Sequence, residues 1–478
     1  MHPLPFSNTL MPDSNLLVRC ATRRAEVVRQ LAAAGGGVAL LPTAPEAMRN
    51  RDADYPYRHD SYFYYLTGFT EPHSLLALQV TASGSSRSVL FCRDKDVERE
   101  IWDGFRWGPE AAREAFGFDA ALPIDSLEAE LPKLLADQPA VWWPFAVHAG
   151  LETQVERWLA AVRAQARAGV TAPRTQHDLC AILDDMRLFK DPYELDVIRR
   201  ASTISAQGHI RAMQASRRGL LQPPSQGLRE YHLEAELLHT FRQGGSQAPA
   251  YGSIVAAGAN ACVLHYRASD APVRAGDLVL IDAACELDGY ASDITRTFPA
   301  DGRFTGAQRA LYEVVLAAQL AAIEASVEGA RFTDPHEAAL RILAQGLLDH
   351  GLIARNAAPD VDAVIATGAY KRFYMHRTSH WMGMDVHDCG DYAEPGEALE
   401  IQPDGSRKRP ARILRDAMVL TIEPGLYVRA ADDLPAEFHG IGIRIEDDIA
   451  VRAGGQPCEV LTAAAPKTAA DIEAVMRG

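Results

Sequence analysis

Apolar and polar residues follow two different periods along the first part of the chain. Apolar residues recur three and four positions apart, as on one face of a helix, at residues 15–34, 111–116 and 127–136. Short continuous apolar runs, typical of buried strands, lie at residues 38–42, 75–80, 88–92 and 141–145. An SGSS turn separates the second run from the third, which predicts a hairpin or neighbouring strands. This alternation of helices and strands indicates an α/β domain.

A long helical region follows, with the helical period at residues 177–187, 192–215 and 229–244. Between the first two helices, Asp191 can cap a helix that has Pro192 at its first position. We place a domain boundary just before this break, which gives an amino-terminal domain of residues 1–186 and a second domain of residues 187–478. The alternative is a corner between two helices of a single domain.

The second domain is richer in short β runs. After residue 248, runs such as DLVLIDAACELDGY and DITRTFPADG precede two amphipathic helices at residues 305–328 and 335–350. Two further β runs follow, AMVLTIEPGLYV and GIGIRIEDDIAVR, and this order predicts an α+β domain. Residues 391–415 are rich in Glu, Pro, Gly and Arg, so we expect a surface loop or ribbon there.

Composition narrows the class of protein. The 478 residues are 47% apolar and 23% charged, and the net charge of -15 argues against a nucleic-acid surface, which needs clustered Lys and Arg. The seven cysteines are scattered without a CxxC pair, as in a reduced cytoplasmic protein. The start, MHPLPFSNTL, lacks the features of a signal peptide, and no apolar run reaches the length of a membrane span. We therefore expect a cytoplasmic protein without nucleic-acid or membrane partners.

Two aspartates stand where a charge is costly. Asp282 ends the apolar run LVLID, and Asp293 follows eleven residues later in YASDITRT. A charge at the end of an apolar strand is unfavourable unless it is paired or bound to a metal. On adjacent short strands, these carboxylates could face each other across a hairpin. Taken singly, Asp282 could cap a turn and Asp293 could accept backbone hydrogen bonds.

Two glutamates occupy similar positions near the end of the chain. Glu423 follows AMVLTI and precedes a Pro-Gly pair. In GIGIRIEDD, strand alternation places the isoleucines on one face and Arg444 with Glu446 on the other. A solvated outer strand face is the alternative explanation for this second pair.

Histidines gather between these acids, in HRTSHWMGMDVHD. His376, His380 and His387 lie within twelve positions, in a chain with 15 histidines. A single histidine is usually a structural residue, but three beside Trp, Met and Val favour a site. Four carboxylates with one or more imidazoles suit two divalent cations, which can lower the pKa of a shared water. The other histidines and Arg444 would position the substrate, so the residues alone predict a dinuclear metallohydrolase.

The same segments carry a resemblance to a known family. LVLIDAACELDGYASDITRTFP, HWMGMDVHD, LTIEPGLY and GIGIRIEDD resemble, in this order and spacing, the pita-bread dinuclear metallopeptidases. The resemblance implies that Mn, with Co or Zn as alternatives, is bound by Asp282, Asp293, His380, Glu423 and Glu446. It implies that Asp293 and Glu446 bridge both ions, that Asp282 serves one, and that His380 and Glu423 serve the other. Glu423 would also exchange protons with a bridging hydroxide.

The resemblance also assigns substrate contacts. His265 in VLHY and His387 in DVHD would bind the scissile carbonyl and flank the proline of the substrate. Arg444 would support the ligands, and His376 would be a nearby catalytic group. Tyr251 would form part of the wall around the proline, although it could simply belong to the core.

The first domain narrows the resemblance further. YPYRHDSYFYYLTGFTEPHSLLAL and EIWDGFRWG resemble the amino-terminal domain of bacterial aminopeptidase P, a domain that methionine aminopeptidases lack. The resemblance implies a homo-oligomer, either a dimer or a tetramer, built with the help of this domain. It also implies that Trp102 approaches the active site of a neighbouring subunit and contacts substrate there.

The implied activity is hydrolysis of the Xaa-Pro bond at the free amino terminus of a peptide. Prolidase, which cuts Xaa-Pro dipeptides with the same metal site, is the alternative enzyme. A non-catalytic pita-bread module that binds peptides should have lost ligands that all stand here, and a creatinase-like amidinohydrolase typically lacks this metal set. Two departures from the family pattern, Arg377 and the long segment 391–415, lie near the predicted cleft and could alter the preference for peptide length.

Overall fold

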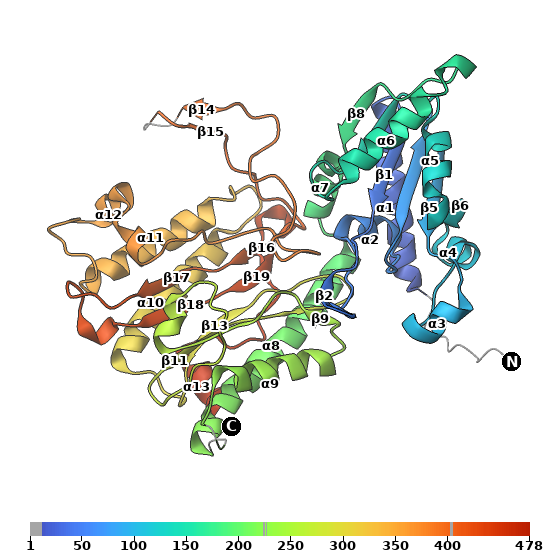
Figure 1. Cartoon of the computed structure of the whole chain (residues 1–478). Helices are drawn as coiled ribbons and strands as arrows, with labels where there is room; N and C mark the ends of the chain where they lie inside the picture. The colour runs from blue at the N-terminus through green and yellow to red at the C-terminus, as the bar shows by residue number, and fades with distance from the viewer. Residues whose placement is uncertain (1–11, 223–224, 226, 402–404) are drawn as a thin grey trace. The chain divides into compact units, whose positions relative to one another are not determined.

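The computed structural model describes residues 12–222, 225, 227–401 and 405–478. The segment in which no signal peptide was expected lies outside the described residues. The chain forms two compact units, Met1–Met186 and Arg187–Gly478 (Figure 1). None of the helices in the described ranges is long and apolar enough to cross a membrane.

The first unit is built on a six-stranded sheet in the order β6-β5-β4-β1-β7-β8. Its strands are β1 (Gly37–Pro42), β4 (Leu75–Val80), β5 (Ser86–Cys92), β6 (Ala120–Pro123), β7 (Ala140–Trp143) and β8 (Thr175–Asp178). Strands β4 and β5 are antiparallel with Leu75 opposite Phe91, which confirms the predicted hairpin. A small ribbon, β2 (Met48–Asn50) with β3 (Ala53–Asp54), lies outside this sheet.

Helices surround the sheet of the first unit. They are α1 (Ser14–Ala33), α2 (Ser61–Thr67), α3 (Val97–Asp103), α4 (Pro109–Phe116), α5 (Leu127–Leu135) and α6 (Leu151–Arg163). Helix α7 (Cys180–Leu188) runs across the boundary between the units. Trp158 of α6 is buried against alternate strand residues such as Val38 and Phe91, as expected where one face of a sheet is covered by helices. The helix predicted from residue 177 begins late, because His177 pairs with Trp142 as part of β8.

The second unit begins with two long helices, α8 (Pro192–Leu221) and α9 (Glu230–Gln243). Asp191 caps α8 as predicted, since its carboxylate accepts the backbone N–H groups of Tyr193 and Glu194. The Glu194 carboxylate accepts the Asp191 N–H in return, which completes a capping box. This cap fixes where α8 begins.

Short sheets follow the two helices in the second unit. One has the order β10 (Ile254–Ala257), β11 (Leu278–Asp282) and β13 (Thr295–Pro299). Another has the order β16 (Val419–Ile422), β19 (Asp447–Ala450) and β20 (Glu459–Val460). Two-stranded sheets join β17 (Gly425–Val428) to β18 (Ile441–Arg444), and β9 (Ala248–Pro249) to β12 (Cys285–Glu286).

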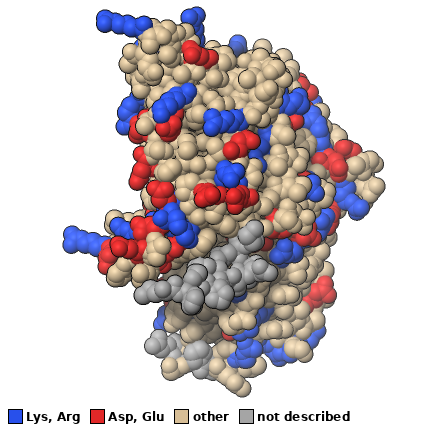
Figure 2. All heavy atoms as spheres, turned by 90° about the vertical axis from the view of Figure 1, so that its right-hand side faces the viewer, with Lys and Arg blue, Asp and Glu red and all other residues tan. Residues whose placement is uncertain are grey.

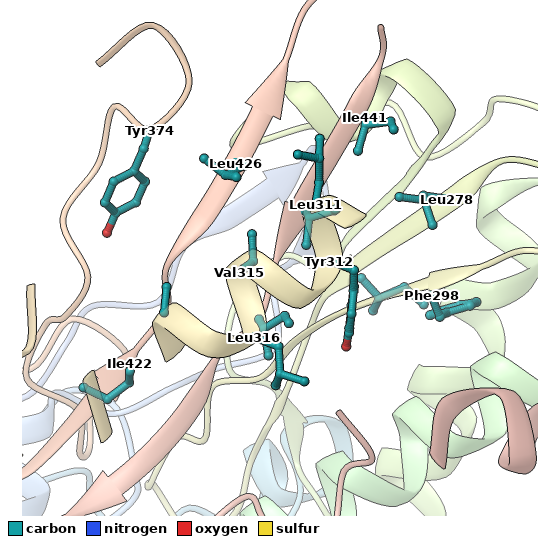
Figure 3. Close-up of a cluster of buried hydrophobic side chains, with 14 of the residues drawn as sticks. Leu278, Phe298, Leu311, Tyr312, Val315, Leu316, Tyr374, Ile422, Leu426 and Ile441 are labelled. Carbon is teal, nitrogen blue, oxygen red and sulfur yellow. The ribbon is translucent and has the colours of Figure 1, made fainter. Parts of the chain in front are cut away.

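Four helices complete the second unit: α10 (Gly306–Ala325), α11 (Asp334–Asp349), α12 (Val361–Thr367) and α13 (Ala469–Arg477). The apolar face of α10 carries Leu311 and Val315, which pack in one buried cluster with Phe298 of β13 and Leu426 of β17 (Figure 3). Helix α10 therefore packs against strands from both halves of the unit, and Asp293 and Glu423 each stand two residues before one of these strands.

Segment 391–415 forms a ribbon in its described part, as expected. Strands β14 (Glu400–Ile401) and β15 (Arg407–Lys408) pair antiparallel, while residues 402–404 lie outside the described ones. On the face drawn in Figure 2, the described Lys and Arg side chains are interspersed with Asp and Glu side chains.

Candidate active site

The second unit contains a cavity of about 780 Å³ that gathers most of the predicted site residues. It is lined by Tyr251, His265, Asp282, Asp293, His376, His380, His387, Glu423, Arg444 and Glu446. Trp102 belongs to the first unit, where its side chain on α3 is 82% exposed. The chain thus brings together residues that are far apart in sequence, from the β runs and the histidine segment.

Strand pairing positions the two aspartates. Asp282 ends β11 directly opposite Thr295 of β13, and Asp293 lies two residues before Thr295. The Asp293 backbone N–H donates to the Asp448 carboxylate at 2.9 Å, which anchors the turn into β13. The two carboxylates therefore come from neighbouring antiparallel strands, as their positions in the sequence suggested.

The two glutamates reach the same place from β16 and β18. An isolated bridge joins Thr295 to Glu446, and the Thr295 hydroxyl donates to Glu446 Oε2 at 2.6 Å. Glu423 follows β16, and its backbone N–H donates to the Thr378 carbonyl at 2.8 Å. Arg444 and Glu446 are only 4% and 2% exposed, so the alternative of a solvated strand face is wrong.

Hydrogen bonding fixes the orientation of the His380 ring. Its Nδ1 lies 2.9 Å from the Trp381 carbonyl oxygen, and because a carbonyl only accepts, Nδ1 carries the proton. The lone pair of the neutral ring is then on Nε2, which lies 3.5 Å from Asp293 Oδ2 and 3.8 Å from Glu423 Oε1. The His387 ring stacks on His380 with centroids 4.0 Å apart. In metal-binding histidines, the ring nitrogen that does not bind the metal typically donates a hydrogen bond, as His380 Nδ1 does here.

The carboxylates of the cavity crowd one another. Burial raises the pKa of Glu446 well above its usual value, and the charges of Asp293, Glu423 and Asp282 raise it further. Burial also raises the pKa of Glu423 to about 7, although His380 and Arg444 act in the opposite direction. Burial alone would lower the pKa of His380, but Asp293 and Glu423 raise it to about 9. The cluster therefore favours additional positive charge.

The donor atoms fit a divalent metal. Oxygen or nitrogen atoms of Asp293, His380 and Glu446 lie within 4.8 Å of one another. Asp282 Oδ1 is buried and has no hydrogen-bond partner among the described residues, which leaves a carboxylate oxygen available as a ligand. Carboxylate oxygens with an imidazole nitrogen are a suitable donor set for Mn, Co or Zn.

Arg444 and Tyr427 connect the acids to the histidine segment. The Arg444 guanidinium donates to Asp282 Oδ2 at 2.6 Å and to the Tyr427 hydroxyl at 3.0 Å. His376 Nδ1 donates to the Arg377 carbonyl at 2.7 Å, so its Nε2 accepts from the Tyr427 hydroxyl at 2.8 Å. Burial lowers the pKa of His376 to about 3, which keeps the ring neutral. Both ring nitrogens are therefore engaged within the chain.

Tyr251 contacts a carboxylate rather than serving only as core. Its hydroxyl donates to Asp293 Oδ1 at 2.5 Å. Burial and the nearby carboxylates raise the pKa of this phenol well above its usual value, so it remains a donor.

Sequence reasoning missed two residues of the site. His336, at the start of α11, also lines the cavity, and its Nδ1 lies 2.8 Å from the Thr378 hydroxyl. Tyr427 contacts Arg444 and His376 behind the lining. It lies four positions after Glu423, and strand alternation could have indicated that both are on the same side of the chain. His336 had no such signal, because it stands alone in a helix far from the other histidines.

Comparisons with known proteins agree with this geometry. The pattern of metallopeptidase family M24 matches residues 196–453, and that of the aminopeptidase P N-terminal domain matches residues 20–142. The chain is 41% identical over 454 residues to Xaa-Pro aminopeptidase of Escherichia coli, covering 95% of this chain and 96% of that protein. The chain belongs to metallopeptidase family M24. The predicted family and the class of enzyme, a metallopeptidase of the aminopeptidase P type, are therefore confirmed.

Solved structures of M24 enzymes share the fold of both units. The structure of Pseudomonas aeruginosa aminopeptidase PepP matches with a TM-score of 0.88 and 45% identity, covering 96% of this chain and 98% of that one. Zinc-substituted Escherichia coli aminopeptidase P in complex with product matches with a TM-score of 0.87 and 40% identity over the same shares. The predicted fold class, an α/β amino-terminal domain with an α+β pita-bread catalytic domain, is confirmed.

Proposed function

We propose that this M24 enzyme hydrolyses the Xaa-Pro bond at the free amino terminus of peptides and requires two divalent ions, foremost Mn. The observation that carries the proposal is the crowding of Asp282, Asp293, Glu423 and Glu446 around His380 in one cavity. The similarity of the whole chain to Xaa-Pro aminopeptidases supports the choice of substrate.

The proposed division of ligands follows the donor atoms. Asp293 and Glu446 would be shared by both ions, Asp282 would hold one, and His380 with Glu423 would hold the other. The unpartnered Oδ1 of Asp282 and the proton on His380 Nδ1 support these roles. When bound, the two ions would lower the pKa of a water between them and polarise the scissile carbonyl.

The other residues would handle protons and substrate. Glu423 would accept a proton from the attacking water and pass it to the leaving proline nitrogen, a role suited to a carboxyl group whose pKa lies near 7. His265 and His387 are exposed to the cavity and would contact the scissile carbonyl and flank the proline. Tyr251 would form part of the wall beside the proline. Arg444 would keep Asp282 in position, since it donates to that carboxylate. His376 would be a catalytic group beside Glu423, with its Nδ1 3.7 Å from Glu423 Oε2.

We further propose a homo-oligomer, a dimer or tetramer, in which Trp102 contacts substrate in a neighbouring subunit. The exposure of Trp102 and of Ile101, 82% and 78%, supports an interface at α3. Trp102→Ala should leave metal content unchanged and reduce turnover. Unchanged kinetics in the oligomer would contradict this role.

Two measurements test the proposed function. Elemental analysis of the freshly purified protein should find two divalent ions per chain. After reconstitution with Mn²⁺, an Xaa-Pro-Yaa tripeptide should be hydrolysed, with release of the first residue. Turnover of Xaa-Pro dipeptides alone would identify a prolidase, and absence of turnover with Mn²⁺ or Co²⁺ would support a non-catalytic peptide-binding protein.

A further inference from the structure

The cavity that holds the acids also carries a group of basic side chains. Arg377, Lys408 and Arg409, here called the basic wall, line it together with Arg267. Arg377 follows the first histidine of the HxxxH segment, and Lys408 and Arg409 belong to the ribbon of segment 391–415. These are the two places expected from the sequence to influence the preference for peptide length.

The charges of the basic wall are not neutralised by neighbouring acids. No side-chain hydrogen bond or ion pair joins Arg377, Lys408 or Arg409 to another residue in the described part of the chain. Glu400 stands opposite Lys408 in the ribbon, but no ion pair joins these two described residues. Glu394 and Glu397 are engaged elsewhere, because Glu394 pairs with Arg415 and Glu397 pairs with Arg331. The three cations therefore remain available to a ligand.

The basic residues also act on a shared neighbour inside the cavity. Burial, followed by the charges of Arg377 and Lys408, lowers the pKa of His336 to about 4. Both cations thus reach the same part of the cavity from different segments. The chain as a whole has a net charge of -15, so a group of positive side chains in one cavity differs from the rest of the protein. Positive charge in a concave site attracts anions to that site.

Strand alternation separates Lys408 from its neighbour in the same ribbon. Arg407 and Lys408 are adjacent in β15, where successive side chains point to opposite faces. Lys408 lines the cavity, whereas Arg407 is not among the residues that do. The two residues therefore form a natural pair of test and control, with the same charge, exposure and local structure.

We propose that the basic wall binds a carboxylate carried by the residue after proline, so that the enzyme prefers peptides with an anionic group at that position. This inference rests on the proposed function. A peptide bound at the acidic ligands through its amino end would present its third residue toward the remaining lining of the cavity. A guanidinium or ammonium group stabilises a carboxylate through charge-assisted hydrogen bonds.

Two carboxylates could occupy this place, and peptides can distinguish them. One is the C-terminal carboxylate of a tripeptide, which would make the enzyme prefer short peptides. The other is the side chain of Asp or Glu in a longer peptide. Suitable substrates are Ala-Pro-Gln amide, which has neither group, Ala-Pro-Gln acid, which has only the first, and Ala-Pro-Glu amide, which has only the second.

The test compares full-length proteins reconstituted with Mn²⁺. For the wild-type protein, kcat/KM for at least one carboxylate-bearing peptide should exceed that for Ala-Pro-Gln amide on the order of tenfold, mainly through KM. The preference should shrink when salt rises from about 0.05 to 0.5 M, because ions screen exposed charges. Lys408→Gln with Arg409→Gln should abolish the preference while turnover of the neutral peptide stays within about twofold. Arg407→Gln should retain the preference.

The possible outcomes separate this inference from the proposed function. Equal rates on all three peptides, a preference that survives in the double variant, or an equal loss in Arg407→Gln would overturn the basic wall and leave the aminopeptidase activity standing. Turnover of none of the peptides by the wild-type protein would overturn both. A preference for only one carboxylate-bearing peptide supports the inference and identifies which carboxylate is bound.

Discussion

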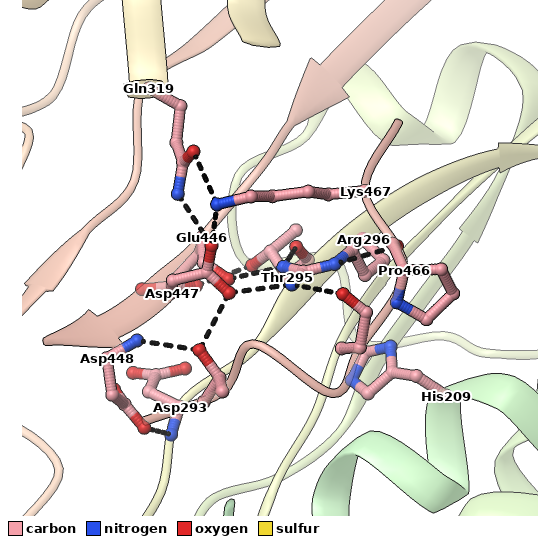
Figure 4. Close-up of polar contacts among 12 residues, drawn as sticks. His209, Asp293, Thr295, Arg296, Gln319, Glu446, Asp447, Asp448, Pro466 and Lys467 are labelled. Atoms are coloured by element: carbon pink, nitrogen blue, oxygen red, sulfur yellow. Dashed lines mark hydrogen bonds and ion pairs between the residues drawn. The ribbon is translucent and has the colours of Figure 1, made fainter. Parts of the chain in front are cut away.

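Glu446 and Asp447 are adjacent carboxylates with opposite surroundings. They are 2% and 0% exposed. Asp447 accepts from Arg296 at 2.6 Å and from Lys467 at 2.7 Å, and the Gln319 and Thr462 side chains also donate to it (Figure 4). Burial would raise the pKa of Asp447, but these two cations lower it to about 2. Asp447 and its partners form a compensated cluster.

Glu446 lies on the other side of the same segment, among like charges. Its neighbours include the carboxylates of Asp293, Glu423 and Asp282, which raise its pKa together with burial. The contrast shows why burial of a carboxylate alone does not indicate a site. A buried acid with a full set of donors stabilises the fold, whereas a buried acid surrounded by other acids is neutralised by taking up a proton or by a bound cation.

Glu446, Asp293, Glu423 and Asp282 are here called the uncompensated group. The largest expected effect comes from removing one of these acids. Asp293→Ala should lower kcat/KM by at least about a thousandfold, because a ligand shared by two ions would be lost. Elemental analysis should show less than the wild-type metal content, while circular dichroism should show an intact fold. Near-normal turnover with two bound ions would refute the ligand assignment.

The second prediction compares the two clusters directly in the metal-free protein. Asp447→Ala should lower the free energy of unfolding by about 3–5 kcal/mol, because Arg296 would be left buried without its carboxylate. Glu446→Gln should leave the unfolding free energy unchanged or raise it, because it removes a buried like charge. Urea denaturation in the presence of a chelator measures both.

A reversal of these two effects would contradict the comparison. If Glu446→Gln destabilised the metal-free protein as much as Asp447→Ala, both acids would be structural. In the metal-loaded protein, by contrast, Glu446→Gln should lose the stabilisation that bound ions supply, since binding to the folded state alone adds to stability.

The third prediction concerns a histidine beside the acids that is not a proposed ligand. His387→Ala should reduce turnover about a hundredfold through lost contact with the substrate, and the metal content should stay near that of the wild type. The stacked neighbour, His380→Ala, is the matched comparison and should lose metal as well. Equal metal loss in both variants would extend the ligand set to His387.

The fourth prediction follows from the pKa shifts within the uncompensated group and at His380. Folding raises the pKa of Glu423 from 4.5 to about 7 and that of His380 from 6.5 to about 9. A raised pKa stabilises the fold below the unfolded value and loses this contribution as pH rises through the folded value. The metal-free protein should therefore lose stability between about pH 5 and 9, on the order of 3 kcal/mol for each of the two groups.

Asp447 should show the opposite dependence, since its pKa is lowered from 3.8 to about 2. Its contribution is present above pH 3.8 and is lost as pH falls toward 2. Unfolding measured across pH for wild type and Glu423→Gln isolates the first effect. An unchanged slope in the variant between pH 5 and 9 would show that Glu423 is not responsible.

Sequence reasoning identified two acids of the site because each stands at the end of an apolar run. Asp282 and Glu423 follow this pattern, whereas Asp293 was found by its position eleven residues after Asp282 and Glu446 by strand alternation. The compensated role of Asp447 could not be read in this way, since Arg296, Gln319 and Lys467 come from distant segments. Strand pairing, rather than the sequence around the acid, decides which of two neighbouring carboxylates is neutralised.

Part of the fold was also predictable from the sequence, namely the long helices. In amphipathic helices such as α8 and α10, the helical pattern of apolar residues repeats over a long stretch and a capping residue marks the start. Their starts at Pro192 and Gly306 were therefore close to those expected. The short helix α2 and the strand β8 were missed because they are defined by tertiary packing and by pairing with β7. His336 was missed for the same reason, since only the position of α11 brings it to the cavity.

The smallest expected effect concerns Tyr251, whose phenol contacts the carboxylate of Asp293. Tyr251 donates to Asp293 Oδ1 at 2.5 Å, so Tyr251→Phe removes a neutral donor without altering the charge of the cluster. We expect the metal-free protein to lose about 1 kcal/mol of unfolding free energy and the metal-loaded enzyme to lose only a few-fold in turnover, because bound ions take over the neutralisation of Asp293. Urea denaturation with and without Mn²⁺ measures the difference. A larger loss of stability with metal than without it would mean that Tyr251 holds the metal-bound arrangement rather than relieving the free carboxylates.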